Sequence, residues 1–248
     1  MSVYAFSDIH GNGILWDSIK NFLSPDDKVY FLGDAIDRGP DGYRIMKEIL
    51  ADPRITYLKG NHEYMMDNAL YHYQLFGQVG GQEMRLWDIN GCFPTFDAWK
   101  EAGKDFSIID TLHDLPLEAE YTSPLGFTFL MSHAGYTPGD RPPLDETFLW
   151  DRDHVMQDVE NIELVNPMIR ILHGHSPAPY YAPIIQRNMK MNGFFHSDFE
   201  CDLINNIMVY GNRRLKIDID CWTIHTNSIT LLDLDTLETY VFEGDKII

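Results

Sequence analysis

The chain has 248 residues, a hydrophobic fraction of 44% and a formal net charge of −19. This length suits one large α/β domain, the absence of any run of about 20 apolar residues argues against a membrane span, and the acidic charge disfavours nucleic acid as a partner. Three widely separated cysteines and an N-terminus without a secretory pattern predict reduced thiols and a cytoplasmic location.

Runs rich in β-branched and aromatic residues predict eight strands, at 2–6, 28–32, 54–58, 127–131, 169–173, 215–219, 228–232 and 238–242. Between the first three strands, apolar residues recur at helical spacing over 14–23 and 43–50. The order strand, helix, strand, helix, strand predicts parallel pairing with right-handed crossovers, in a central sheet covered on both sides. The last three strands resemble an antiparallel meander.

Two segments interrupt this pattern within a domain that we expect to be single and to span 1–248. Residues 63–115 contain many aromatic side chains without obvious strands, which predicts a helical excursion beside the mouth of a cleft. Residues 176–213 begin with three prolines and are predicted to form a long loop excursion.

Five short polar clusters each follow the end of a predicted strand. They are Asp8-Ile9-His10, Gly33 to Gly39, Gly60 to Glu63, Ser132 to Gly135 and His173-Gly174-His175. Because ligands gather at the carboxyl ends of strands in open α/β sheets, we expect these clusters to meet. Oxygen and imidazole donors suit divalent first-row metals, and no thiolate pair indicates a structural zinc. Two metals held about 3.5–4 Å apart would clamp the oxygens of a phosphoryl displacement.

The first two clusters supply carboxylates and one imidazole. Asp8 and His10 are two residues apart, so an extended backbone would point both toward one metal, although a surface Asp beside a capping loop is an equal alternative. Asp34 follows a glycine and is the candidate bridging ligand, because its two oxygens can neutralise two cations.

The loop after Asp34 and the third cluster supply groups for catalysis. Asn61 can face a metal while the adjacent His62 faces the leaving group. Asp37 is the expected partner of His62, and a histidine with such a partner titrates near neutral pH and suits general acid work. Arg38 would bring a planar donor fork to phosphate oxygens, whereas Glu63 is expected to fix the loop.

The last two clusters supply imidazoles that follow buried strands. Taken alone, His133 and His175 would more often be satisfied core residues, but together with the other clusters they are predicted to be ligands. His173 is a weaker candidate ligand. The other histidines, including His154 and His225, are treated as structural or exposed.

In this order the clusters resemble the calcineurin-like metallophosphoesterases, and within them the phosphoprotein phosphatase branch with its bacterial and phage members. The matching motifs are a DxH, a GDxxDRG, a GNHE, an HAG and a GH, over roughly the first 175 residues. The resemblance implies an α/β fold of the metallophosphoesterase type, in which central mixed β-sheets are flanked by helices.

The resemblance also implies roles for individual residues. A first metal would be held by Asp8, His10 and Asp34, and a second by Asp34, Asn61, His133 and His175. A hydroxide bridging the metals would attack phosphorus directly, and His62, assisted by Asp37, would protonate the leaving alkoxide. The phosphoryl oxygens would be bound by Arg38 and Arg152; a salt-bridged surface arginine is the alternative for Arg152.

The chain departs from the family pattern in two places. The family's glycine-containing turn after the late Ile-Asp is replaced by Asp220-Cys221-Trp222. The excursion at 176–213 carries cations that could contact a negatively charged substrate or be solvated surface charges, namely Arg187, Lys190, Arg213 and Arg214.

Three functions remain open from the sequence. The first is a metal-dependent phosphatase acting on phosphomonoesters, including phosphoserine, phosphothreonine or phosphotyrosine in a phosphorylated protein, peptide or small molecule. The second is hydrolysis of a symmetrical dinucleoside tetraphosphate. The third is a metal-binding interaction module without activity, which the intact motif positions oppose. Manganese is the metal we expect first, and iron, zinc or cobalt would also suit the donors.

Overall fold

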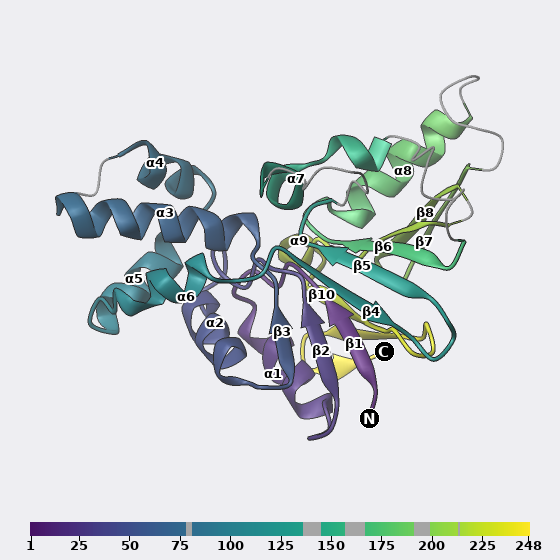
Figure 1. Cartoon of the computed structure of the whole chain (residues 1–248), viewed down its shortest axis with the longest axis horizontal. Helices are drawn as coiled ribbons and strands as arrows, with labels where there is room; N and C mark the ends of the chain where they lie inside the picture. Colours follow the sequence, from purple (N-terminus) through teal and green to yellow (C-terminus); the bar gives the residue numbers. More distant parts are fainter. Residues whose placement is uncertain (78–80, 136–144, 157–166, 191–198, 213) are drawn as a thin grey trace.

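The computed structural model describes residues 1–77, 81–135, 145–156, 167–190, 199–212 and 214–248. Two six-stranded mixed sheets lie at its centre, and helices flank them (Figure 1). The first sheet has the order β12-β11-β10-β1-β2-β3, with β12 Lys246–Ile247, β11 Thr239–Glu243, β10 Ser228–Asp233, β1 Val3–Phe6, β2 Lys28–Phe31 and β3 Ile55–Tyr57. The second has the order β4-β5-β6-β9-β8-β7, with β4 Glu118–Thr122, β5 Thr128–Ser132, β6 Ile169–His173, β9 Lys216–Asp218, β8 Ile207–Asn212 and β7 Phe199–Ile204. The predicted fold class is confirmed.

The two sheets pack against each other through apolar side chains from both. Val3 and Leu32 of the first sheet and its loops share one buried cluster with Phe129 and Leu172 of the second. The opposite face of the first sheet is covered by α1 Gly13–Phe22 and α2 Gly42–Ala51, which bury Trp16 and Ile45. As predicted, β1, β2 and β3 are parallel neighbours. Their carboxyl ends therefore meet at one edge of the sheet.

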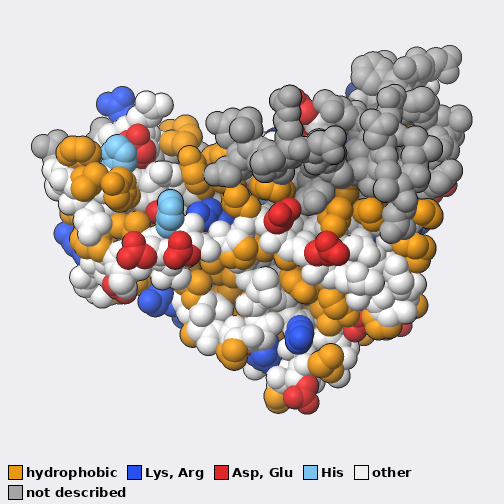
Figure 2. Space-filling view, in the orientation of Figure 1, with side chains coloured by type: hydrophobic (Ala, Val, Ile, Leu, Met, Phe, Trp, Pro, Cys, Tyr) orange, Lys and Arg blue, Asp and Glu red, His pale blue; other side chains and the backbone are white. Residues whose placement is uncertain are grey.

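Four helices follow β3 and form a lobe beside the sheets (Figure 1). They are α3 Asn61–Phe76, α4 Gln82–Ile89, α5 Phe93–Glu101 and α6 Ser107–His113. Buried Trp87 and Trp99 pack with Phe96 at the centre of the lobe. On its outer part, hydrophobic side chains gather over α3 and α4 (Figure 2), where Phe76 and Ile89 are exposed.

The segment 176–213 is not the long loop that its prolines suggest. It contains α8 Ala178–Met189 and the hairpin of β7 and β8. Pro179 lies in the first turn of α8, where a missing N–H costs no hydrogen bond. Asn205 and Asn206 both have positive φ (51° and 64°), as a two-residue hairpin turn requires. The Asn-Asn pair was the sequence signal for this hairpin.

The predicted antiparallel meander at the C-terminus is also wrong. β9 pairs in parallel with β6 in the second sheet, whereas β10 and β11 form an antiparallel pair in the first. The short helix α9 Thr223–Thr226 carries the chain from one sheet to the other. Two further short helical segments, α7 Asp145–Trp150 and a 3-10 turn at Asp153–Met156, follow β5. In the described part of the chain, no helix has the length and apolar character needed to cross a membrane.

Candidate active site

Four of the five predicted clusters line a cleft of about 420 Å³ at the carboxyl ends of the strands, and His133 of the remaining cluster lies next to Asp34. The loops after β1 and β2 are joined by backbone hydrogen bonds, including His10 N to Asp34 O at 3.0 Å. Six predicted site residues have positive φ although they carry side chains: Asp8, His10, Asp34, Asp37, Arg38 and His175. Strained backbone of this kind persists only where the surroundings hold it, and it concentrates at functional sites.

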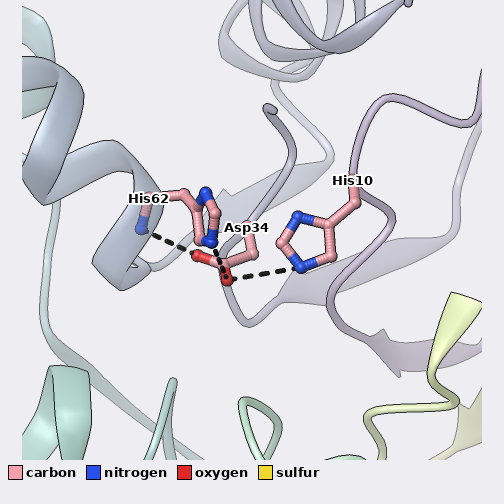
Figure 3. A group of neighbouring side chains, drawn as sticks. All are labelled: His10, Asp34 and His62. Atoms are coloured by element: carbon pink, nitrogen blue, oxygen red, sulfur yellow. Dashed lines mark hydrogen bonds and ion pairs between the residues drawn. The ribbon is translucent and has the colours of Figure 1, made fainter. Parts of the chain in front are cut away.

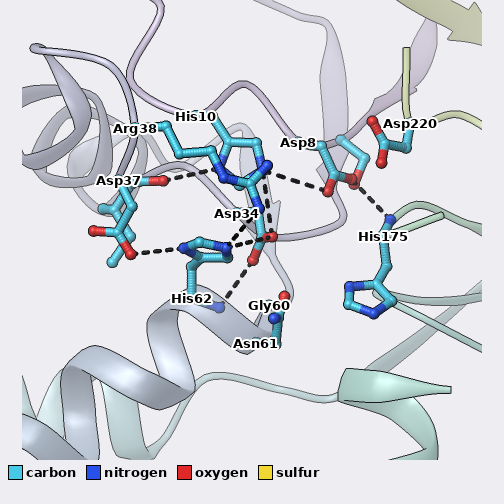
Figure 4. A network of polar contacts seen from close by, with 12 residues as sticks. Asp8, His10, Asp34, Asp37, Arg38, Gly60, Asn61, His62, His175 and Asp220 are labelled. Atoms are coloured by element: carbon cyan, nitrogen blue, oxygen red, sulfur yellow. Dashed lines mark hydrogen bonds and ion pairs between the residues drawn. The ribbon is translucent and has the colours of Figure 1, made fainter. Parts of the chain in front are cut away.

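Asp34 lies at the centre of the cluster. Its Oδ2 is 3.6 Å from His10 Nε2 (Figures 3 and 4). Its Oδ1 is 3.5 Å from His133 Nε2. Oδ1 also accepts a hydrogen bond from the backbone N–H of His62 at 3.1 Å. The two oxygens therefore face two different groups of donor atoms, as a bridging carboxylate requires. Burial, followed by the charge of Asp8, raises the pKa of Asp34 well above its ordinary value.

The imidazoles around Asp34 each direct a ring-nitrogen lone pair toward the cluster, and that of His10 is shared with Arg38. His10 Nδ1 lies 3.1 Å from Ile36 O and His133 Nδ1 lies 2.7 Å from Leu32 O, so in each ring the hydrogen-bond network assigns the proton to Nδ1. His133 Nε2 then faces Asn61 Oδ1 at 3.0 Å, and both atoms are acceptors. Buried His175 Nε2 has no hydrogen-bond partner among the described residues. Burial lowers the pKa of His10 and His175 well below the ordinary value, which keeps both rings neutral.

Converging acceptors without protons are costly to bury, and a cation would satisfy them. Two sets of potential ligand atoms lie within 4.8 Å of one another, one from His10, Asp34 and His62 and one from Asp34, His133 and His175. Asp34 belongs to both. The residues therefore fit a pair of divalent metal ions that share one carboxylate.

Asp8 also lines the cleft and lies beside His10. Its Oδ1 is 3.9 Å from His10 Nε2, while its Oδ2 accepts hydrogen bonds from Ser7 Oγ and, at 3.0 Å, from the backbone N–H of His175. Gly174 makes this contact possible, because a Cβ at that position would lie 2.3 Å from Asp8 Oδ2. The loops after β1 and β6 are thus held together through one carboxylate.

His62 and Asp37 form a buried pair beside the cluster. His62 Nδ1 is 2.6 Å from Asp37 Oδ2, which also accepts a hydrogen bond from Trp87 Nε1 at 2.7 Å. This arrangement leaves Nε2 of His62 on the side of Asp34, 3.8 Å from its Oδ2 (Figure 4). The expected titration near neutral pH is not found, because burial, followed by the charge of Arg38, lowers the pKa of His62 well below its ordinary value.

Replacing Asp37 by Asn should change how stability depends on pH. Burial raises the pKa of Asp37 to about 7, above the value of about 3.9 in an unfolded chain. The folded protein therefore binds this proton more tightly, and the stability linked to it is lost as pH rises from about 4 to about 7. Asp37→Asn keeps an acceptor for His62 and Trp87 without the charge. We expect its free energy of unfolding, relative to the unaltered protein, to rise by a few kcal/mol between pH 5 and pH 8. Denaturant titrations in chelator at both pH values measure this, and parallel pH profiles would contradict it.

The two predicted arginines line the cleft, and both are exposed. Arg38 Nη1 and Nη2 donate to His10 Nε2 at 2.9 Å and to His62 Nε2 at 3.2 Å. The charge of Arg152 adds to the lowering of the pKa of His175, after burial and the charge of His133. Both guanidinium groups can therefore reach an anion held in the cleft.

Glu63 holds the loops together. Its carboxylate, 0% exposed, accepts hydrogen bonds from the backbone N–H groups of Asp34, Ala35 and Gly60 and from the hydroxyl of Tyr57, at 2.7–3.0 Å. These partners agree with the structural role expected from the sequence.

Substitution of Glu63 by Ala should therefore destabilise the protein strongly. Each of the four donors would lose a buried acceptor, at about 1–3 kcal/mol apiece, so we expect the free energy of unfolding in chelator to fall by about 3 kcal/mol or more. Urea denaturation measures this, with Glu83→Ala on the lobe as the matched control. A loss below about 1 kcal/mol would show that Glu63 does not hold the loops.

Some sequence candidates lie outside the cleft. Both ring nitrogens of His173 are engaged, with Tyr210 Oη at 2.8 Å and Gly174 O at 3.0 Å, so it does not face the cluster. Arg214 pairs with Glu200 and Asp202 on the β7–β8 hairpin. Arg187 and Lys190 are not among the described residues that line the cleft, and Arg213 lies outside the described residues.

Other residues line the cleft without having been predicted. They are Asn90, Trp150, Pro177, Asp220, Trp222, Thr223, Ile224 and His225. The departure at Asp220-Cys221-Trp222 was the signal for the last five, but a change of turn does not reveal which side chains face the cleft. His225, treated as structural or exposed, is exposed and lines the cleft.

Comparison with known families decides the class of protein. The model of the calcineurin-like phosphoesterases matches residues 1–212. The chain belongs to this family. This calcineurin-like phosphoesterase is thus a metal-dependent hydrolase of phosphate esters, and the residues gathered around Asp34 are suited to its metals.

Relatives of this phosphoesterase include protein phosphatases. Serine/threonine-protein phosphatase 2 of Escherichia coli (strain K12) is 28% identical over 183 residues, which cover 70% of this chain and 78% of the relative. A serine/threonine-protein phosphatase of Caenorhabditis elegans is 35% identical over 74 residues, 28% of this chain, and the match spans only 20% of that relative's length.

Solved structures share the fold. A cold-active protein-tyrosine phosphatase of a Shewanella species has a TM-score of 0.53 at 15% identity, covering 99% of this chain and 80% of its own. A structure described as a diadenosine tetraphosphatase has a TM-score of 0.51 at 16% identity, covering 99% and 91%. At these identities the likeness shows the fold alone.

Proposed function

We propose that this phosphoesterase is a phosphatase that removes phosphate from phosphomonoesters, including phosphorylated serine, threonine or tyrosine in proteins. One observation carries the proposal: the two oxygens of Asp34 face separate groups of lone pairs inside a cleft that two arginines line. A paired cation site with phosphate-binding groups beside it is suited to hydrolysis at a single phosphorus atom.

We assign the candidate ligands to two sites. The first comprises Asp8, His10 and Asp34, and the second Asp34, Asn61, His133 and His175. Divalent ions bound there would lower the pKa of a bound water and offset the charge of the phosphate. Manganese remains our first expectation, and cytoplasm the predicted location.

The residues around these sites take complementary roles. Once Arg38 binds the phosphate instead of His62 Nε2, this nitrogen would hold the proton for the leaving oxygen, because Nδ1 is occupied by Asp37 at 2.6 Å. Since burial opposes the protonated ring, the Asp37 carboxylate and a bound anionic substrate must favour it together. Arg38 and Arg152 would bind the outer phosphoryl oxygens.

The charge of the cleft favours a single phosphate over a polyphosphate. Its described lining residues include two arginines and no lysine, against the carboxylates of Asp8, Asp34 and Asp220. Two cations and two arginines suffice for one phosphate, whereas four phosphates would need further positive charge along the cleft. The alternative, hydrolysis of a symmetrical dinucleoside tetraphosphate, has support from a shared fold only.

A side-by-side assay tests the proposal. The manganese-loaded protein should release phosphate from phosphopeptides with higher kcat/KM than it cleaves a dinucleoside tetraphosphate. Faster cleavage of the tetraphosphate would favour the alternative. Absence of turnover on every phosphomonoester, with both metals shown to be bound, would refute the proposal.

A further inference from the structure

Aromatic side chains that the roles above do not use line part of the cleft. Trp222 and His225 line it, with ring centroids 4.3 Å apart, and Trp150 lines it with its ring 6.2 Å from that of His175. We call Trp150, Trp222 and His225 the aromatic wall. Trp222 also contacts the ring of Tyr180, at 5.7 Å. Apolar ring surface thus adjoins a candidate ligand of the second metal site.

The backbone at Trp222 is held in an unfavourable conformation. Trp222 has a φ of 56°, a region that glycine adopts readily and that a bulky residue rarely enters. Its N–H donates to Asp220 Oδ1 at 2.8 Å, and its carbonyl accepts from the N–H groups of His225 and Thr226 at 2.8 and 3.0 Å. A glycine would relieve the strain at no cost to these backbone bonds. The cost of keeping a tryptophan here indicates that its ring has a use in the cleft.

We propose that the aromatic wall binds the aromatic leaving group of a phosphomonoester, so that the protein prefers aryl phosphates, with phosphotyrosine as the peptide substrate, over alkyl phosphates such as phosphoserine. This inference rests on the proposed function. Arg38 and Arg152 would hold one phosphate in the same cleft that the aromatic wall lines, and a ring attached to that phosphate can stack or pack edge-on against indole and imidazole faces. A serine side chain offers no such surface.

The test compares two peptides that differ only in carrying phosphotyrosine or phosphoserine. The unaltered, manganese-loaded protein should prefer phosphotyrosine. Trp222→Leu should lower kcat/KM for phosphotyrosine about threefold to tenfold, mainly through KM, and change the phosphoserine value less than twofold. Trp222→Phe should restore most of the loss. His225→Leu provides a second variant at an exposed position, and Phe76→Leu, at an exposed position on the lobe, is the matched control.

The outcomes separate this inference from the proposed function. Equal losses on both peptides, or no rescue by Phe, would overturn the inference and leave a phosphomonoesterase whose wall is structural. A loss confined to a dinucleoside tetraphosphate would overturn it in favour of a nucleobase against the wall. No turnover of either peptide by the metal-loaded, unaltered protein would refute the proposed function itself.

Discussion

Replacement of His62 by Ala should lower kcat on an alkyl phosphomonoester by about 10²–10⁴-fold while the bound metal is unchanged. His62 Nε2 faces the cluster while Nδ1 is paired with Asp37, so the ring is oriented to give a proton to a leaving oxygen. A leaving group that is already a weak base needs less protonation by a general acid. The loss should therefore be much smaller on a nitrophenyl phosphate than on a serine phosphate.

Steady-state kinetics and metal analysis of the same preparations measure both quantities. His72→Ala is the matched control, since His72 pairs with Glu83 on the helical lobe, away from the cleft. An unaltered rate would remove His62 from the role of acid. A loss of bound metal would instead show that His62 is a ligand. This outcome is informative because His62 belongs to a potential ligand set with His10 and Asp34.

Replacement of Asp34 by Asn should weaken binding of both metals by about 100-fold or more and abolish turnover. Substitution of a group that only supports a metal ligand often lowers metal affinity by roughly 10–100-fold. The loss should be larger for Asp34, because it would contact both ions itself. The difference in stability between the variant and the unaltered protein should have opposite signs in chelator and in manganese. In chelator the variant should be at least as stable as the unaltered protein, because it lacks a buried carboxylate whose pKa is raised by burial and by Asp8.

With manganese the order should reverse, since only the unaltered protein gains stability from bound metal. Calorimetric titration and thermal unfolding with and without manganese follow both effects. Asp67→Asn, at a buried carboxylate paired with Lys59 outside the cleft, is the control. Retention of two tightly bound ions by Asp34→Asn would show that Asp34 does not bridge them.

The parts of the fold that follow from local patterns were predictable. All eight predicted strands are present, and the first three pair in parallel as their intervening helices required. Strands with weak hydrophobic patterns were missed. β4 alternates between exposed and half-buried positions at the edge of the second sheet, so it lacks the apolar run that marks a buried strand.

Sheet membership was not predictable at the C-terminus. β9, β10 and β11 follow one another closely, and short connections usually join neighbours in one sheet. Here the turn at Trp222 and α9 separates β9 from β10, and the sequence of that turn carries no common signal. The same turn brings Trp222 and His225 into the cleft, which explains why neither was predicted to line it.

The gathering of the predicted site residues followed from their positions at strand ends, but their orientation did not. Motif spacing could place His133 and Asn61 in one cleft, and only coordinates show the two acceptor atoms 3.0 Å apart. Likewise, the pKa of His62 depends on complete burial, which a sequence does not report.

Two cations that share Asp34 are central to the proposed chemistry. Crystals of the manganese-loaded protein, measured at the manganese absorption edge, test this directly. We expect two anomalous peaks about 3.5–4 Å apart, one on each side of the Asp34 carboxylate and flanked by His10 and His175. A single peak at full occupancy, or peaks remote from Asp34, would rule out a metal pair bridged by this carboxylate.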